Sequence, residues 1–315
     1  MQRTKRNLRR ELLKTLGAGA LATSVAGCAS IPGSSASYRR PYSRNPWVAP
    51  RISHENRIRE VVGHRPYRPG GFVVRTERVG DKIVVHNYGH GGAGITLCWG
   101  SSALAVRETM GMEHRDVAVI GSGVMGLTSA RLLQDAGWNV TIYTRDMARH
   151  TTSNVAGGEW GPASAHDPDV SSAAFKSQLE FALRISHHAH TNLGGADYGI
   201  YWKELYYPSN NAQRESEGSY GHLYPYEGTL GPGEHPFNTP YAHHAVTMMI
   251  EPATFLRRLT EDVHQARGRF VIRNFADKES LLSLPEPVIF NCTGLGARQL
   301  FGDEDLLSLI HISEP

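Results

Sequence analysis

Three glycines, Gly121, Gly123 and Gly126, have the G-x-G-x-x-G spacing that binds the pyrophosphate of a dinucleotide. Gly121 permits a tight turn, Gly123 allows the backbone to approach the phosphates, and Gly126 allows close packing of the helix that follows. The free amides at the start of that helix carry partial positive charge, which favours phosphate binding. The predicted contacts come from the whole turn, residues Gly121, Ser122, Gly123, Val124, Met125 and Gly126.

The residues around this turn predict the strand–turn–helix–strand unit that the motif requires. Residues 116–120 (DVAVI) are apolar and rich in β-branched side chains, which is typical of a buried strand. Residues 127–137 (LTSARLLQDAG) predict an amphipathic helix that ends at glycine, and residues 139–146 (NVTIYTRD) predict a second strand. Because this context distinguishes a dinucleotide site from a chance glycine pattern, we expect an α/β domain of the Rossmann type.

The end of the second predicted strand leaves the identity of the dinucleotide open. Arg145 suits the 2′-phosphate of NADP, whereas Asp146 suits the ribose hydroxyls of FAD. The next segment, residues 151–162 (TTSNVAGGEWGP), favours a flavin, because its hydroxyls suit phosphate oxygens and its glycines let the chain pass beneath a flat ring. On composition alone the segment is also compatible with an ordinary polar loop. Its candidate cofactor contacts are Thr151, Thr152, Gly157 and Gly158.

These segments together resemble the D-amino-acid oxidase family of FAD enzymes. In that family a threonine-rich segment followed by VA-small-G-x-W wraps the flavin, and residues 288–297 (VIFNCTGLGA) are similar to its returning strand and turn. The resemblance extends from about residue 51 to residue 300. It implies FAD as the cofactor, with Phe275, Thr293 and Gly294 among its contacts. It also implies an α/β fold, in which an FAD-binding Rossmann-type domain carries an antiparallel-rich α+β substrate domain.

A second glycine-rich segment, residues 86–100 (HNYGHGGAGITLCWG), precedes the fingerprint. It resembles the signature that closes the family's catalytic core near the usual C-terminus, and residues 64–75 resemble the strand before that signature. We therefore interpret residues 60–109 as circularly permuted relative to the usual order, which makes the two glycine turns neighbours around one flavin. The connection between the permuted segment and the first fingerprint strand needs few residues, because a helix predicted at 101–110 ends beside that strand. Domain termini also often lie close together, which makes a permutation physically plausible.

The resemblance also implies roles in substrate binding. Arg65 corresponds to the clamp for the substrate carboxylate, since a planar guanidinium meets a carboxylate bidentately. The carbonyl of Gly92 would meet the substrate ammonium, and Gly91 and Gly94 would lie against the flavin edge. Thr96 would begin a helix whose positive end stabilises negative charge on the reduced flavin. No side chain is assigned as a catalytic acid or base.

The function implied by the resemblance is oxidative deamination of D-amino acids. Hydride passes from the substrate Cα to the flavin, oxygen accepts the electrons to give hydrogen peroxide, and the imino acid hydrolyses to a 2-oxo acid and ammonia. Alternatives are a related flavin amine or glycine oxidase, a dehydrogenase that passes electrons to a membrane quinone, and a non-catalytic FAD-binding fragment. The preferred side chain and the oligomeric state stay open.

The first 28 residues predict an export signal. Arg9 and Arg10 precede a weakly apolar stretch too short for a comfortable membrane span, and VAGC ends at Cys28 like a lipobox. A frayed basic amphipathic helix is the alternative. We expect a periplasmic or cell-envelope lipoprotein held at the membrane by lipidated Cys28, with residues 29–50 as a linker. The net charge of +3 gives no electrostatic reason to expect nucleic-acid binding.

The predicted organisation places the FAD-binding domain at 51–165, the substrate domain at 166–265 and a return to the FAD-binding domain at 266–300. Residues 301–315 include SLIHISEP, which matches nothing in the family pattern, and we expect a truncated end there.

Several other residues invite a functional reading that we do not adopt. Cys98 and Cys292 lack C-x-x-C spacing and are expected to be buried free thiols. His187 and His190 share a helical face but have no acidic or cysteine partner nearby, so no metal site is predicted. Tyr241, which precedes an apolar strand, is given no role.

Overall fold

The computed structural model describes residues 51–58, 60–213 and 220–310. Every element below belongs to one compact unit, residues 47–315. The predicted export signal at 1–28 and linker at 29–50 lie outside the described residues. Within the described ranges, no helix has the length and apolar character needed to cross a membrane.

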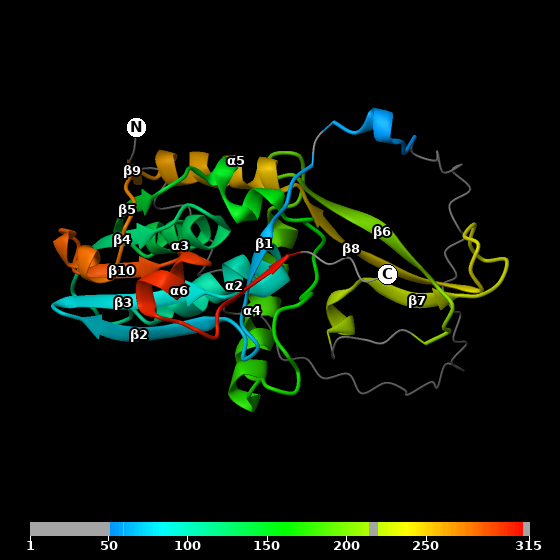
Figure 1. Cartoon of the computed structure of the whole chain (residues 1–315), viewed down its shortest axis with the longest axis horizontal. Coiled ribbons are helices and arrows are strands. Elements are labelled where there is room, and N and C mark those ends of the chain that lie inside the picture. Colours follow the sequence, from blue (N-terminus) through cyan, green and yellow to red (C-terminus); the bar gives the residue numbers. More distant parts are fainter. Residues whose placement is uncertain (1–50, 59, 214–219, 311–315) are drawn as a thin grey trace, which may run out of the picture. The chain divides into compact units, whose positions relative to one another are not determined.

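A six-stranded sheet forms the centre of the described unit, with strand order β2-β3-β10-β4-β5-β9 (Figure 1). The β2–β3 pair is antiparallel, and every other pairing in this sheet is parallel. The predicted fingerprint strand is β4, whereas the second predicted strand, β5, ends at Thr144, before residue 146. The strands are β2 (Val73–Val79), β3 (Lys82–Tyr88), β4 (Asp116–Ile120), β5 (Asn139–Thr144), β9 (Arg269–Ile272) and β10 (Val288–Asn291).

Alternate residues of these strands face two different cores. Val85, Val119 and Phe290 belong to the core shared with the four long helices, while Val84 and Ile289 belong to a second core on the opposite face. The period-2 alternation is what a sheet covered on both sides requires. The helices are α2 (Gly94–Arg107), α3 (Val124–Asp135), α4 (Ala173–Asn192), α5 (Pro252–Gln265) and, on the opposite face, α6 (Gly296–Phe301).

The segment interpreted as permuted supplies β2, β3 and α2 to this layered unit. Helix α2 begins at Gly94, inside the glycine-rich segment, rather than at residue 101, and it ends at Arg107. It contacts both α3 and α4, and α3 in turn contacts α5. Helices α4 and α5 lie within the range predicted as the substrate domain, yet they pack on the helical layer of the large sheet.

A separate antiparallel sheet has the order β6-β8-β7. Its strands are β6 (Ile200–Ser209), β7 (Tyr226–Leu230) and β8 (Tyr241–Ile250), so Tyr241 is the first residue of a strand rather than a residue before one. The backbone of residues 158–160 extends this sheet: Trp160 N–H donates to Met248 O at 2.8 Å, and Ile250 N–H donates to Gly158 O at 2.8 Å. The loop predicted to wrap the flavin is thereby joined to the antiparallel sheet.

A third pairing joins the two ends of the described unit. Strand β1 (His64–Tyr67) pairs antiparallel with β11 (Leu307–Ile310), so part of the segment expected to be a truncated end forms a strand. Short 3₁₀ turns complete the described fold: η1 (His54–Asn56), η2 (Gly91–Ala93), η3 (Ala148–His150), η4 (Thr152–Val155), η5 (Gly221–Leu223) and η6 (Glu279–Ser283).

Candidate active site

The fingerprint turn after β4 is built so that only glycine fits. Gly121 has φ +104°, and a Cβ added there would lie 2.6 Å from the carbonyl oxygen of Cys292. A Cβ added to Gly126 would lie 1.9 Å from the Gly121 oxygen. The turn is therefore pressed against the end of β10 on one side and against its own helix on the other, as the sequence pattern predicts.

The N-terminus of α3 is a cradle for an anion. Gly123 is the N-cap residue, and the Val124 N–H donates to Ser153 Oγ at 3.0 Å. A Cβ on Gly123 would meet the same Ser153 hydroxyl at 3.2 Å, so the glycine leaves room for an oxygen beside the helix amides. Ser153 lies in the hydroxyl-rich run after β5, but the sequence analysis did not select it.

The other hydroxyls of that run are placed differently. Thr151 donates to the Ala148 carbonyl at 2.7 Å and has its Cβ within 4.0 Å of the position a Cβ on Gly123 would take. Thr152 is exposed at the start of η4. The structure thus places Thr151 and Ser153 at the helix terminus and turns Thr152 outward.

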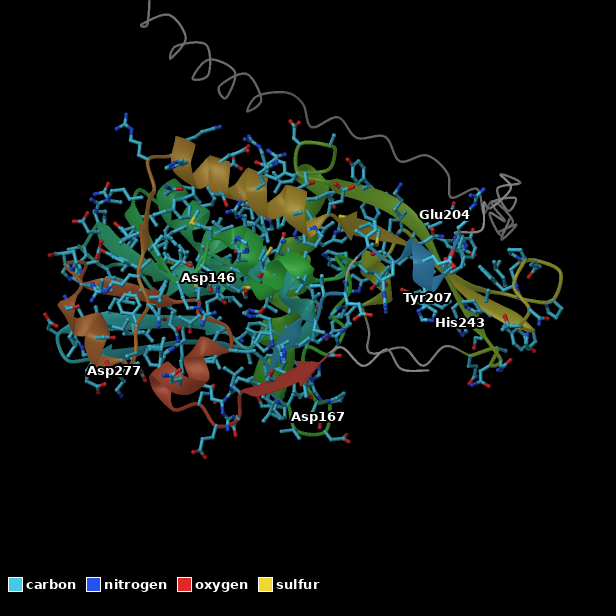
Figure 2. The ribbon with its side chains drawn as sticks, turned by 45° about the horizontal axis from the view of Figure 1, so that its top comes forward. Asp146, Asp167, Glu204, Tyr207, His243 and Asp277 are labelled. Atoms are coloured by element: carbon cyan, nitrogen blue, oxygen red, sulfur yellow. The ribbon has the colours of Figure 1, made fainter. Side chains whose placement is uncertain are left out.

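The carboxyl end of β5 carries the polar residues expected to recognise a ribose. Ser122 Oγ donates to the Asp146 carbonyl at 2.8 Å, which fixes Asp146 beside the fingerprint turn. Arg145 is 75% exposed, and its Nε lies 2.7 Å from Asp146 Oδ2. Figure 2 shows Asp146 in this part of the molecule, apart from Glu204, Tyr207 and His243 of the antiparallel sheet. The Asp146 carboxylate therefore lies at the carboxyl end of β5 and is paired with the Arg145 guanidinium.

The two neighbouring glycines of residues 151–162, the segment predicted to wrap the flavin (the flavin loop), have different environments. Gly158 has φ +79°, and an added Cβ would lie 2.0 Å from the Ile250 carbonyl, so glycine is required by close packing on β8. Gly157 has no atom within 4 Å of an added Cβ and borders open space. We expected both glycines to let the chain pass beneath a flat ring. At Gly158 the need for glycine is explained instead by close packing on the neighbouring strand β8.

The earlier glycine segment meets the same region. A Cβ on Gly94 would lie 3.8 Å from Met125 Cε, so the start of α2 lies against the start of α3. Thr96, in the first turn of α2, donates to the Gly161 carbonyl at 2.8 Å and accepts from the Gly161 N–H at 3.1 Å. The two glycine turns and the flavin loop are neighbours, as a permuted order predicts.

Arg65 lies beside the glycines of this first turn. Its Nη1 donates to Ser164 Oγ at 3.0 Å, and a Cβ on Gly92 would lie 3.1 Å from the same nitrogen. Gly91 has φ +58°, and a Cβ there would meet the Ser164 carbonyl at 1.9 Å. Ser164 itself has φ +51°, a conformation that non-glycine residues adopt only where surrounding contacts hold it. Sequence reasoning missed Ser164, because neither its conformation nor its partner is visible locally.

Charge in this region comes from Arg65 rather than from the adjacent histidine. His90 is fully buried and stacks on Phe72, with ring centroids 4.7 Å apart. Burial lowers the pKa of His90 to about 3, so the ring is neutral at pH 7. Arg65 is therefore the cation next to the Gly91–Gly92 turn.

The remaining predicted contacts lie along β10 and behind the sheet. Thr293 Oγ1 donates to Asn291 Oδ1 at 2.7 Å, and Gly294 has φ +55° in the turn that follows. Phe275 is buried in the core on the α6 face, where its ring lies 6.1 Å from that of Tyr143. The structure places Thr293 and Gly294 next to the fingerprint turn, whereas the Phe275 side chain serves the core.

Three of the residues given no functional role, Cys98, Cys292 and His190, are buried. Cys98 and Cys292 are buried free thiols, and burial raises the pKa of both, that of Cys292 to about 12. His190 is fully buried 3.7 Å from the Cys98 sulfur, and its pKa is lowered by burial to about 3. Across the described ranges, no group of three potential metal ligands comes together.

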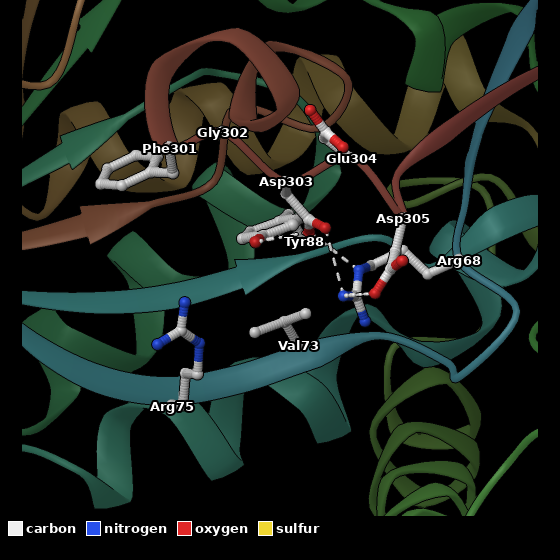
Figure 3. Close-up of a pocket in the computed structure, with 9 residues that line it drawn as sticks. All are labelled: Arg68, Val73, Arg75, Tyr88, Phe301, Gly302, Asp303, Glu304 and Asp305. Atoms are coloured by element: carbon white, nitrogen blue, oxygen red, sulfur yellow. Dashed lines mark hydrogen bonds and ion pairs between the residues drawn. The ribbon is translucent and has the colours of Figure 1, made fainter.

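A cavity of about 370 Å³ lies between β2, β3 and the end of α6 (Figure 3). Arg68 crosses it to bind Asp303 at 2.8 and 3.2 Å, and Tyr88 donates to the same carboxylate at 2.8 Å. Burial alone would raise the pKa of Asp303, but hydrogen bonds from Arg68 and Tyr88 hold it below the usual value. This cluster ties the segment after β1 and the end of β3 to the segment after α6.

Comparison with known proteins identifies the family. The sequence model described as "FAD dependent oxidoreductase" matches residues 116–312, which is more than half of the chain and reaches past residue 300. The chain belongs to this family. It is 32% identical over 208 residues to the D-amino-acid oxidase of Streptomyces coelicolor, a match that covers 62% of this chain and 58% of the relative. The D-amino-acid oxidase of Schizosaccharomyces pombe is 29% identical over 201 residues, covering 61% and 56%. The chain thus spans little more than half the length of these relatives.

Partial similarity to solved structures is also found. The glycine oxidase of Bacillus cereus aligns with a TM-score of 0.33 and 18% identity, covering 50% of this chain and 45% of that one. The L-amino acid deaminase of Proteus myxofaciens aligns with a TM-score of 0.35 and 15% identity, covering 65% and 43%. These alignments extend over part of each chain.

Membership of the FAD-dependent oxidoreductase family implies FAD as the cofactor. The residues present fit that group: Gly121 and Gly126 permit the tight turn, and Gly123 has no side chain at the α3 terminus, where the Ser153 hydroxyl now occupies the Val124 N–H that a phosphate oxygen could accept from. Asp146 suits the ribose. These residues come from the ends of β4 and β5, where ligands of open α/β sheets bind.

Proposed function

We propose that the FAD oxidoreductase acts on D-amino acids, converting them to 2-oxo acids with release of ammonia. The observation that carries the proposal is the position of the Arg65 guanidinium. Its Nη1 lies 3.0 Å from Ser164 Oγ, and the group lies against the Gly91–Gly92 turn. A substrate that brings a carboxylate to a partly buried site needs such a charge partner, because an unpaired charge there is costly. The relatives described as D-amino-acid oxidases support the substrate class.

The chain's own residues bind and orient the substrate in this proposal. Arg65 holds the carboxylate through two parallel hydrogen bonds, and the carbonyl of Gly92 accepts from the substrate ammonium. Ser164, by accepting from Arg65 Nη1, keeps the fork facing the turn. When bound, FAD supplies the two-electron acceptor that takes hydride from Cα and passes the electrons to oxygen. The imino acid that results hydrolyses in water.

The experiment that tests this proposal is anaerobic reduction of the FAD-loaded protein by D-alanine, with L-alanine as the matched control. We expect the visible flavin absorbance to bleach with the D-enantiomer and to persist with the L-enantiomer. Bleaching by L-alanine alone, or by an amine without a carboxylate, would assign a different substrate class to the same family. A loaded protein that reacts with none of these would show a non-catalytic FAD-binding chain.

A further inference from the structure

A chain of polar side chains with a buried centre runs under the turn at the end of β10. It begins at Glu77 on β2, continues through His86 on β3 and Asn291 on β10, and ends at Thr293. His86 and Asn291 face each other on neighbouring parallel strands, and both are 0% exposed. Asn291 Nδ2 lies 3.0 Å from His86 Nδ1, although the two residues are 205 positions apart in the sequence.

The hydrogen bonds determine which way the Asn291 amide points. Its Oδ1 accepts from the Thr293 N–H at 3.3 Å and from the Thr293 hydroxyl at 2.7 Å. A backbone N–H can only donate, so the oxygen end of the amide must face Thr293 and the NH₂ end must face His86. His86 Nδ1 is consequently the acceptor, and its proton is on Nε2, which lies 3.5 Å from Glu77 Oε1.

The turn held by Asn291 supports the fingerprint turn. The carbonyl of Cys292, between Asn291 and Thr293, lies 2.6 Å from the position a Cβ on Gly121 would take. The Cys292 N–H in turn donates to the Ile120 carbonyl at 3.0 Å. A displacement of the turn after β10 would therefore displace Gly121 and the amides that follow it.

We propose that His86 is a positioning residue of the FAD site: by accepting a hydrogen bond from Asn291, it fixes the amide that holds the 291–294 turn under the fingerprint glycine. His86 itself lies beneath the site and reaches the cofactor only through this turn. The inference concerns FAD binding and does not depend on which substrate the enzyme oxidises.

Protonation of His86 would reverse its role, because an Nδ1–H would face the Asn291 NH₂ group. Either the hydrogen bond would be lost or the amide would rotate, and rotation would place its NH₂ against the Thr293 N–H. The charged and aromatic groups around the ring are Glu77 and Arg75 from β2, Tyr88 from β3, Phe301 from α6 and Asp303 after α6. Burial lowers the pKa of His86 to about 4, an effect that Glu77 opposes.

The proposal predicts how FAD affinity depends on this side chain. In the full chain stripped of FAD and then titrated with FAD, His86→Leu leaves a buried amide without an acceptor. We expect FAD to bind about ten- to a hundred-fold more weakly, the range that corresponds to one unsatisfied buried polar group. His86→Asn places an amide oxygen near the former Nδ1 and should stay within about three-fold of the wild type. Phe301→Leu is the matched control, since the Phe301 and His86 rings pack edge to face with their centroids 4.8 Å apart and Phe301 makes no hydrogen bond to His86. It should lower the melting temperature and leave FAD affinity unchanged.

A double-mutant cycle separates positioning from general stability. Asn291→Leu should itself weaken FAD binding, and adding His86→Leu to it should cause no further loss, because the partner through which His86 acts is already absent. Additive losses, or wild-type FAD affinity in His86→Leu, would overturn the proposal.

A pH profile tests the same point if His86→Leu does not fold. Because His86 in the folded protein takes up a proton only near its lowered pKa of about 4, the wild type should lose FAD affinity as the pH falls through about 4. His86→Asn cannot titrate and should lose less over that window. Identical profiles for the two proteins would contradict the assignment.

Discussion

Replacing Arg65 with leucine is the sharpest test of the proposed substrate site. The guanidinium donates to Ser164 Oγ at 3.0 Å and borders Gly92, and the side chain is only partly buried. A hydrogen bond to a charged group contributes about 1.5–3 kcal/mol, and partial burial argues against the larger costs seen for fully buried pairs. Since each 1.4 kcal/mol is a factor of ten, kcat/KM for a D-amino acid should fall roughly ten- to 150-fold.

The assay is steady-state oxidation of D-alanine by the FAD-loaded protein, with the FAD absorbance recorded for each variant. Arg65→Leu should retain FAD, because the glycines of the cofactor cradle are untouched. Arg65→Lys should recover part of the loss, since an ammonium keeps the charge but not the planar fork. Arg75→Leu, a change at a 56% exposed arginine on β2, is the control and should leave kcat/KM unchanged. Near-normal turnover by Arg65→Leu would remove Arg65 from the site and weaken the permuted alignment that selected it.

Three further outcomes are expected. Gly158→Ala should lower the melting temperature by about 5 °C or more, because a left-handed φ and a clash with the Ile250 carbonyl together cost roughly 2 kcal/mol. Gly157→Ala is the control, because its Cβ would enter open space, and it should leave the melting temperature nearly unchanged. Equal effects of the two substitutions would contradict the packing argument. Denaturation of the purified protein should release a yellow compound with the mass of FAD, whereas a folded, colourless protein that binds NADP would refute the cofactor assignment. We also propose export as a lipoprotein: changing Arg9 and Arg10 to lysine should leave FAD-loaded protein in the cytoplasm, and undisturbed export would refute the twin-arginine interpretation.

The cofactor site shows where sequence reasoning succeeded and where it stopped. The α/β fold followed from the glycine spacing and the flanking apolar runs, and the family and FAD followed from the resemblance carried by the threonine-rich and returning-strand segments; the family match confirms them. Residues such as Ser153 and Ser164 were missed, because a serine in a polar loop has no local signal until its partner is known. Gly158 was selected for one reason and is explained by another, the carbonyl of a strand that begins at residue 241.

The sequence by itself determined the features that depend on neighbouring residues. The turn at 121–126, the strand before it and the helix after it follow from glycine conformation and from apolar periodicity, both of which act within a few residues. The tertiary structure decided the partners that are distant in the chain: Arg65 and Ser164, 99 positions apart, and His86 and Asn291, 205 apart. Their pairing depends on strand order and on which face of the sheet each side chain occupies. A period-2 alternation of apolar and polar residues predicts which residues of a strand are buried. Only the packing of β3 beside β10 determines that His86 meets Asn291.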